Sequence, residues 1–442
     1  MTTNERGSGL PGSVAGDAVA EGTAVPESGV IDPAVRRLDE TRSFLVGIAP
    51  AGEVVPAVGP DRYLHAGPPL GSHEVPAPMR GALAAVLVFE GRCPTIEKAY
   101  ALLDSGGLEL GSANEAGAVG AVAGVISPRM PVVVIESDTG ARAFSPLNEG
   151  LGRVIRFGAT DDTAIERLRW MCDELAPTLD AAARRLGPLE ITRIQAEGLR
   201  RGDECHNRNV ASSAALICRM GPAICEAAQS PSAAARVLSA ASENPHFFLP
   251  FSMASAKAVT VSAHGVPGSP IVTAMASNGV RFGIRVSGCG DTWFTAPAPV
   301  GEPKLFDGFE LADAHPAMGD SFITECIGLG ACALDAAPAI SSFLGTSPAQ
   351  GRAVVDTMGR LTAGRSTRFL IPHNEYAGTP IGIDVTRVAR YGIGPYANNG
   401  VAHREAGRGQ VGAALTQLPL EPFVEAARSL AGREETTGAA HA

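Results

Sequence analysis

Apolar residues along the chain recur in two patterns, one with the spacing of helices and one with the alternation of strands. Helical spacing predicts helices over 79–90, 95–103, 161–177, 189–199, 210–220, 350–361 and 422–430, with a second helical piece up to residue 185 and Ala-rich helices up to about residue 263. Pro177 is expected to end the helix that begins at Asp161 or Asp162. Strand spacing predicts strands over 131–136 and 367–372.

Two later segments combine these patterns with glycine. Residues 271–276 and 280–286 flank Asn278-Gly279, a dipeptide suited to a type I′ turn, so a β-hairpin is predicted here. Residues 319–334 are predicted to form one long apolar helix, with Asp320 or Ser321 as its N-cap.

The order of these elements indicates an α+β protein of several domains, with mixed sheets and a largely helical middle segment. We expect an N-terminal α/β domain over 33–160, a mainly helical segment over 161–265 and a C-terminal α+β domain over 266–433. Residues 1–32 lack aromatic side chains and are predicted to be a disordered extension, and residues 434–442 a disordered tail.

One short stretch between two predicted helices is polar throughout. It reads Gly202-Asp203-Glu204-Cys205-His206-Asn207-Arg208-Asn209. In one interpretation Asp203, Asn207 or Asn209 caps the following helix. His206 is then a buried imidazole with its hydrogen bonds satisfied. A cap needs only one of these side chains, so the density of titratable groups favours a functional site.

Composition limits what such a site binds. The chain has 442 residues, of which 45% are hydrophobic, and a formal net charge of -10, which argues against a nucleic acid or an anionic membrane as partner and favours small molecules. The eight cysteines form no CxxC pair, so reduced thiols and a cytoplasmic location are expected. Neither a secretory signal nor a membrane span is predicted.

Polar groups beside glycines mark a second candidate region. Arg281 and Arg285 fall on one face of the second hairpin strand, and the turn after it presents Asp291 beside Trp293. An exposed strand face explains the arginines alone, whereas the adjoining turn indicates an anion or carbonyl pocket. Lys257 lies among small and apolar residues. It could be a buried base or anion ligand, but a surface lysine is the favoured interpretation.

Several segments, taken in order, resemble one known family. They are Ala66-Gly67-Pro68-Pro69, Ala118-Val119-Gly120 with Ala123-Gly124, Leu147-Asn148-Glu149-Gly150-Leu151-Gly152, the polar motif Gly202 to Asn209, Thr273-Ala274-Met275-Ala276, Phe282 to Gly288, Trp293 to Ala298, Gly378 to Asp384 and Gly400-Val401-Ala402-His403. Together they resemble the AllG/YlbE/YahG-like family over nearly the whole globular part of the chain.

The resemblance implies a multi-domain α+β fold. One branch of the family is associated with the oxamate carbamoyltransferase of anaerobic allantoin breakdown, which works alongside other subunits. The implied reaction is carbamoyl transfer between oxalurate and phosphate, giving oxamate and carbamoyl phosphate. The chain departs from the family before its Ala-Val-Gly segment, where the resemblance implies histidines and this chain has Asn114-Glu115-Ala116. That difference bears on the substrate and on any metal.

The leading hypothesis is an enzyme acting at a ureido or acyl carbon, with His206 as proton shuttle and Asp203 or Glu204 orienting it. Donors for an oxyanion, a carboxylate or phosphate are expected from Asn207, Arg208, Asn209 and Arg285. The glycine-rich stretch 398–410 is a further candidate oxyanion cradle. Further substrate or anion contacts are expected from Asn148, Glu149, Asp291, Thr379, Asn399 and His403.

Two alternatives stay open. One is an amidohydrolase in which water replaces phosphate as the acceptor, and the other is a non-catalytic subunit that needs partner chains. A homo-oligomer or an assembly with partner subunits is expected. No cofactor is assigned, and a divalent metal stays open, because Asp203, Glu204, Cys205 and His206 supply ligand types without a recognised metal spacing.

Overall fold

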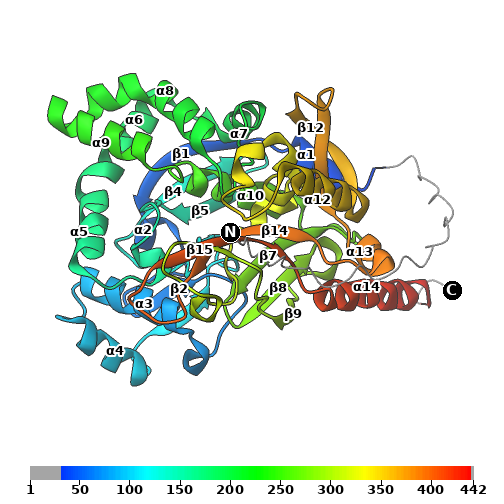
Figure 1. Cartoon of the computed structure of the whole chain (residues 1–442), viewed down its shortest axis with the longest axis horizontal. Coiled ribbons are helices and arrows are strands. Elements are labelled where there is room, and N and C mark those ends of the chain that lie inside the picture. The colour runs from blue at the N-terminus through cyan, green and yellow to red at the C-terminus, as the bar shows by residue number, and fades with distance from the viewer. Residues whose placement is uncertain (1–30, 440–442) are drawn as a thin grey trace, which may run out of the picture. The chain divides into compact units, whose positions relative to one another are not determined.

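The computed structural model describes residues 31–439 (Figure 1). Residues Asp32–Ala442 form one compact unit. Residues 1–30 of the expected extension, and residues 440–442, lie outside the described residues. The unit begins with helix α1 (Pro33–Glu40), which Asp32 caps by accepting a hydrogen bond from the backbone N–H of Ala34 at 2.7 Å. The expected division of the rest into three parts stays a prediction.

The fold is α+β, as expected, with several small sheets among the helices (Figure 1). The first sheet is antiparallel in the order β5-β4-β1-β6 and consists of β1 (Ser43–Pro50), β4 (Pro131–Ser137), β5 (Arg142–Pro146) and β6 (Leu189–Glu190). The strand predicted over 131–136 is thus confirmed as β4. Buried side chains of the sheet share a core with α6 (Ala176–Leu186) and α10 (Leu249–Ala263).

The middle of the chain is helical, as expected. Besides α6 and α10 it contains α5 (Asp162–Trp170), α7 (Ile191–Arg200), α8 (Val210–Ala227) and α9 (Pro231–Glu243). The expected helix end at Pro177 is wrong, because a π-helical turn over Met171–Leu175 leads directly into α6. Pro177 is the second residue of α6, so its missing N–H leaves a gap in the backbone hydrogen bonds of a continuous helix, directly after the π-helical turn.

The second sheet has the order β11-β7-β8-β9. Its strands are β7 (Val272–Asn278), β8 (Arg281–Val286), β9 (Phe294–Pro297) and β11 (Met318–Gly319). The predicted hairpin is confirmed, since β7 and β8 pair antiparallel. The expected type I′ turn is not formed: Gly279 has a φ of 87°, but Asn278 belongs to β7 and lacks the positive φ that this turn needs. Helix α14 (Glu421–Ala439) packs against β8 and β9 and continues beyond Arg433, after which a disordered tail was expected.

The remaining elements surround these two sheets. Near the N-terminal end are the parallel pair β2 (Arg62–His65) and β3 (Glu109–Ser112) and the helices α2 (Ala51–Val54), α3 (Ala77–Phe89) and α4 (Ile96–Asp104). Near the C-terminal end are α12 (Pro348–Leu361), β12 (Thr362–Ile371), β13 (Ala377–Ile383), α13 (Val385–Tyr391), β14 (Tyr396–Ala402), β15 (Gln410–Gln417) and the short β10 (Lys304–Leu305). Helices α3, α4, α12 and α14 confirm predicted helices.

The long helix predicted over 319–334 is not formed. Only α11 (Ile323–Cys326) is α-helical, and a 3-10 helix follows over Gly330–Ala336. Gly328 and Gly330 have φ values of 89° and 57°, which interrupt a right-handed helix. Asp320 does not cap α11, because its carboxylate accepts hydrogen bonds from backbone N–H groups far along the chain.

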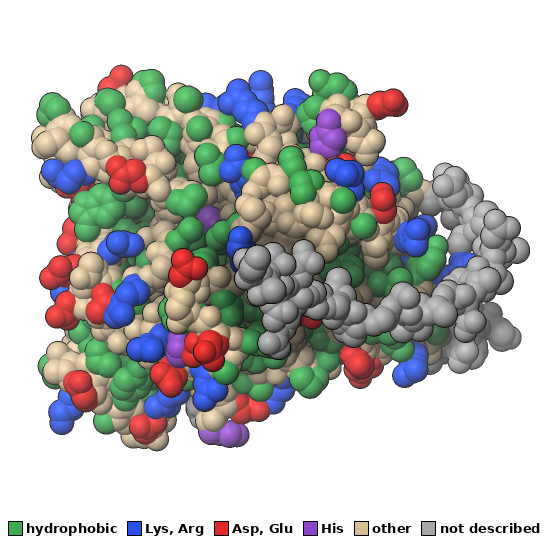
Figure 2. All heavy atoms as spheres, viewed as in Figure 1, with side chains coloured by type: hydrophobic (Ala, Val, Ile, Leu, Met, Phe, Trp, Pro, Cys, Tyr) green, Lys and Arg blue, Asp and Glu red, His purple; other side chains and the backbone are tan. Residues whose placement is uncertain are grey.

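Charged side chains of both signs are interspersed on the face drawn in Figure 2. None of the helices within residues 31–439 combines the length and the apolar character needed to cross a bilayer. All eight cysteines are free thiols, and five of them are buried.

Candidate functional site

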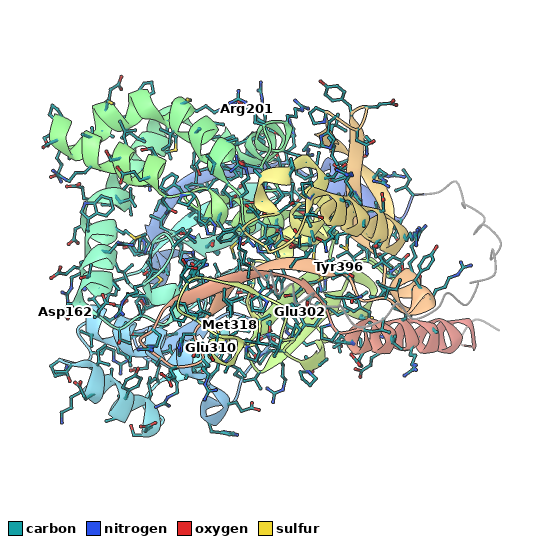
Figure 3. All side chains as sticks on the ribbon, in the orientation of Figure 1. Asp162, Arg201, Glu302, Glu310, Met318 and Tyr396 are labelled. Atoms are coloured by element: carbon teal, nitrogen blue, oxygen red, sulfur yellow. The ribbon has the colours of Figure 1, made fainter. Side chains whose placement is uncertain are left out.

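The polar motif lies at the junction of α7 and α8, as expected. Arg201, labelled in Figure 3, follows the last residue of α7 and immediately precedes the motif. Gly202 and Cys205 have φ values of 95° and 59°, so the backbone turns sharply here. Asp203 Oδ2 accepts hydrogen bonds from the N–H and the hydroxyl of Ser212 at 2.7 and 2.9 Å. Asp203 therefore stabilises the first turn of α8.

Glu204 stabilises the backbone of the motif itself. Its buried carboxylate accepts N–H hydrogen bonds from His206 at 2.5 Å, Asn207 at 2.7 Å and Arg208 at 3.0 Å. Asn398 on β14 donates a fourth bond through Nδ2 at 3.2 Å. Burial raises the pKa of Glu204 to about 7, although His206 and the N–H groups act in the opposite direction. Glu204 thus holds the turn closed and ties it to β14.

His206 is oriented by a carboxylate that the sequence analysis missed. Its Nδ1 lies 2.9 Å from Oε1 of Glu325, and both side chains are buried. Burial by itself lowers the pKa of His206, but the adjacent Glu325 outweighs burial and the pKa is raised. The expectation that Asp203 or Glu204 orients this imidazole is therefore wrong. Glu325 is a lone carboxylate in an apolar stretch, which is the signal that could have found it.

Several polar atoms of the motif region are buried without a hydrogen-bond partner among the described residues. They are Oδ1 of Asp203, Nδ2 of Asn207, Oδ1 of Asn209 and Oδ1 of Asn398. The expected oxyanion donor Arg208 instead donates through Nε to the carbonyl of Gly202 at 2.9 Å. The motif is therefore a mostly satisfied polar network in the interior, with a few atoms left to accept further polar partners.

The segment over 320–326 joins this network to a second polar region around Lys257. Lys257 donates to Oδ1 of Asn114 at 2.7 Å, and only 4% of the residue is exposed. The interpretation of Lys257 as a surface residue is wrong, because α10 is packed between two cores, with Met253 in one and Phe251 in the other. Burial, and to a smaller extent nearby Arg285, lower the pKa of Lys257 to about 7.

Asp320 connects this region to two distant segments of the chain. Its oxygens accept hydrogen bonds from the N–H of Gly67 at 3.0 Å and of Gly120 at 2.9 Å. Burial raises the pKa of Asp320 to about 6, while nearby Lys257 lowers it. Both glycines belong to segments that carry the family resemblance, so those segments meet here.

A cleft of about 310 Å³ opens beside Lys257. Asn114, Glu115, Lys257, His264, Arg285 and Asp291 are among the residues that line it. Two of the site residues predicted from the sequence, Arg285 and Asp291, thus line the same cleft, and the structure adds Lys257 and the Asn114-Glu115 segment. That segment is where the chain departs from the histidines that the resemblance implied.

Arg285 and Asp291 form an ion pair in this cleft. The Arg285 guanidinium lies 5.9 Å from the ring centroid of Trp293, and Trp293 donates through its indole N–H to Glu115 at 3.2 Å. Nε of Arg285 is buried and has no hydrogen-bond partner within the described part of the chain. His264 faces the same pair, with Nε2 3.8 Å from Asp291.

Asn148 and Glu149 belong to a different polar site. The Glu149 carboxylate accepts an N–H hydrogen bond from Arg156 at 3.0 Å, and burial raises its pKa. Asn148 Oδ1 accepts from the N–H of Gly150 at 2.8 Å. Both residues line a separate depression of about 430 Å³. The structure therefore does not bring this pair to the Lys257 cleft.

Three other expected contact residues also lie away from the cleft. Thr379 on β13 is buried against Gly328. Asn399 on β14 accepts a hydrogen bond from Thr416 at 2.7 Å, and His403 lies 3.5 Å from Asp313. The stretch 398–410, expected to cradle an oxyanion, covers most of β14, which begins at Tyr396 (Figure 3), and the connection to the antiparallel strand β15.

Two features of the site bear on thiol chemistry and on metal binding. Burial raises the pKa of Cys205 well above its usual value, so the thiol stays protonated near neutral pH. Within residues 31–439, no group of three or more His, Cys, Asp or Glu side chains is placed to hold a metal ion.

Known proteins similar to this chain were found by sequence and by structure. A family model described as "Oxamate carbamoyltransferase subunit AllG" matches residues 108–321. The chain is 38% identical over 401 residues to "Oxamate carbamoyltransferase subunit AllG" of Escherichia coli (strain K12), covering 90% of this chain and 96% of that protein. It is 36% identical over 394 residues to "Uncharacterized protein YahG" of the same strain, covering 89% and 84%. A crystal structure of a conserved protein of unknown function from Enterococcus faecalis V583 matches with a TM-score of 0.88 and 38% identity, over 90% of this chain and 96% of that one.

Proposed function

Because this chain belongs to the AllG family, we propose that it is a subunit of a carbamoyltransferase-type enzyme that acts on a small ureido compound. The proposed reaction joins phosphate to the carbamoyl group of a compound such as oxalurate. A phosphate oxygen attacks the carbamoyl carbon, the C–N bond breaks, and the amide nitrogen that leaves takes the proton lost by phosphate. The products are carbamoyl phosphate and oxamate.

The observation that carries the proposal is the meeting of Lys257, Arg285 and Asn114 in one small cleft. A guanidinium, an amine that titrates near pH 7 and an amide are groups that bind a carboxylate or a phosphate. The volume of about 310 Å³ suits a substrate of few atoms. With a pKa of about 7, Lys257 is able to bind or release a proton near neutral pH.

In this proposal the polar motif supports the segment that packs beside Lys257 and does not itself line the cleft. Glu325 is hydrogen bonded to His206, and Asp320 and Cys326 of the same short segment face Lys257. His206 is thus linked through Glu325 to the short segment that carries two of the groups acting on Lys257. His206 remains the second candidate for proton transfer, because Nδ1 is oriented by Glu325 as in catalytic acid–histidine pairs.

The test is to measure formation of carbamoyl phosphate from oxalurate and phosphate, with the chain alone and with its partner subunits. We expect Arg285→Met to raise KM for the organic substrate about 10- to 100-fold, because a hydrogen-bonded charged group is removed from the cleft. The matched control is Arg281→Met on the same strand, since Arg281 pairs with Glu74 rather than with a cleft residue.

The outcomes separate the competing functions. Consumption of oxalurate that needs no phosphate would assign an amidohydrolase instead. Equal loss of activity in the Arg285 and Arg281 variants would show that the cleft is not the substrate site. Full activity of the partner subunits without this chain would leave it with no catalytic role.

A further inference from the structure

We propose that Asp291 is a built-in occupant of the anion-binding position on Arg285, and that the carboxylate of a small ligand displaces it. The inference depends on the proposed function only for the kind of ligand, a short carboxylate such as oxamate. The free protein then holds its own carboxylate where the ligand's carboxylate binds.

The two partners of this ion pair differ sharply in burial. The Arg285 side chain is 11% exposed, whereas that of Asp291 is 93% exposed. A guanidinium offers five N–H donors in a planar fork that fits a carboxylate with two parallel hydrogen bonds. Asp291 meets the fork from the solvent side, and the buried Nε of Arg285 has no partner among the described residues. Arg285 therefore has unused donors for a ligand that enters the cleft.

Little in the structure holds Asp291 in place. It follows the 3-10 turn over Ser287–Cys289 and Gly290, which has a φ of 63°. Besides Arg285, the polar side chain near its carboxylate within the described part of the chain is His264, at 3.8 Å. Burial lowers the pKa of His264 to about 4, so this imidazole is neutral near pH 7 and does not attract Asp291 by charge. Displacement of Asp291 thus breaks one ion pair whose carboxylate partner is exposed to solvent, which weakens the interaction, and the incoming carboxylate restores a partner for the buried guanidinium.

Besides Arg285, the cleft contains further polar groups that can bind a ligand. Asn114 lines the cleft but is only 1% exposed; its Oδ1 accepts a hydrogen bond from Lys257 at 2.7 Å, and its side-chain amide acts on the Asp320 carboxylate, whose pKa it lowers. A short carboxylate on Arg285 can therefore also meet the amine of Lys257. Glu115, the other acidic residue at this end, instead accepts a hydrogen bond from Trp293.

The experiment is calorimetric titration of the full chain with sodium oxamate and, separately, with inorganic phosphate. Wild type is compared with Asp291→Asn, Asp291→Glu and Glu115→Gln; the last removes the negative charge that acts on Arg285 from a distance but makes no ion pair with it. We expect Asp291→Asn to bind oxamate about two- to fivefold tighter, the gain that follows from removing an exposed ion pair that competes with the ligand. Asp291→Glu should bind like wild type, and Glu115→Gln should gain less than Asp291→Asn.

The results decide the inference independently of catalysis. Unchanged or weaker oxamate binding by Asp291→Asn would overturn it, and so would an equal gain in Glu115→Gln, which would reflect general electrostatics. A gain for phosphate without one for oxamate would overturn the carboxylate assignment. If Asp291→Asn tightens oxamate binding but no carbamoyl transfer is found, the proposed function fails while displacement of Asp291 stands. Because the Asp291 side chain is exposed, its substitution should leave the fold intact. Circular dichroism of each variant checks this.

Discussion

From the burial of Lys257 we predict how the free energy of unfolding depends on pH, whatever the function of the protein. Replacing Lys257 by Met keeps most of the side-chain volume and removes the amine. Burial lowers the pKa of this amine from 10.5 to about 7 in the folded protein. Between these pKa values the unfolded chain carries one more proton at this position than the folded chain. The free energy of unfolding of the wild type therefore rises with pH in this window, and Lys257→Met lacks that rise.

The size of the effect follows from the shift. Each pH unit between the two pKa values is equivalent to about 1.4 kcal/mol, and allowing for partial titration at the lower end leaves about 2 kcal/mol between pH 7 and pH 9. Below about pH 7 both states hold the proton, so the difference between wild type and variant levels off there. Other groups facing this amine titrate as well, but they are present in both proteins; they are Arg285, Asp320, Cys326, Glu115 and His264.

The assay is equilibrium unfolding in urea at pH 7, 8 and 9, followed by fluorescence and circular dichroism together. We expect the wild type to gain about 2 kcal/mol relative to Lys257→Met across this range. Lys98→Met is the control, because Lys98 is exposed on α4, and it should follow the wild type at every pH. Parallel curves for wild type and Lys257→Met would refute the argument that the amine is buried and uncharged above neutral pH.

Two further predictions concern the network behind the cleft. Glu325→Gln should lower the pKa of His206, because burial is then opposed only by the smaller effect of Glu204. NMR titration of labelled histidine measures this, and an unchanged pKa would show that Glu325 does not set it. The sign follows from linkage: the raised pKa of His206 stabilises the fold at low pH and ceases to do so as pH rises through it, so Glu325→Gln should lose more stability at pH 6 than at pH 9. Gly67→Ala should lower the free energy of unfolding by more than about 1 kcal/mol, because Gly67 has a φ of 87° and a Cβ would lie 2.5 Å from the backbone at Ser277 and Asn278. Gly106→Ala is its control, with a φ of 71° but no atom within 4 Å of the added Cβ, and an equal loss in both variants would show that close packing at Gly67 is unimportant.

Local patterns in the sequence predicted the local elements well. The alternation around Asn278-Gly279 became β7 and β8, and the apolar run after Pro131 became β4. The motif was correctly placed between two helices, since a run of eight residues without a large apolar side chain breaks the helical spacing of apolar positions. Its burial in the interior was not visible in that spacing. The helix predicted over 319–334 failed because two glycines there adopt positive φ, which spacing of apolar residues does not reveal.

The candidate site was only half visible in the sequence. Arg285 and Asp291 were found because they lie six residues apart around one turn. The partner of His206 was missed because Glu325 lies 119 residues further along the chain. Lys257 was misjudged because its neighbours in sequence do not say that α10 is packed between two cores.

By itself, then, the sequence determined the α+β class, most of the helices and strands, and a family membership carried by short polar and glycine-rich segments. Tertiary structure decided which of the polar groups face a cleft and which support it. The physical reason is that burial and long-range pairing set both the orientation and the pKa of a side chain. These contacts show that the carboxylates of Asp203 and Glu204 accept hydrogen bonds from backbone N–H groups, whereas Lys257 lines the cleft.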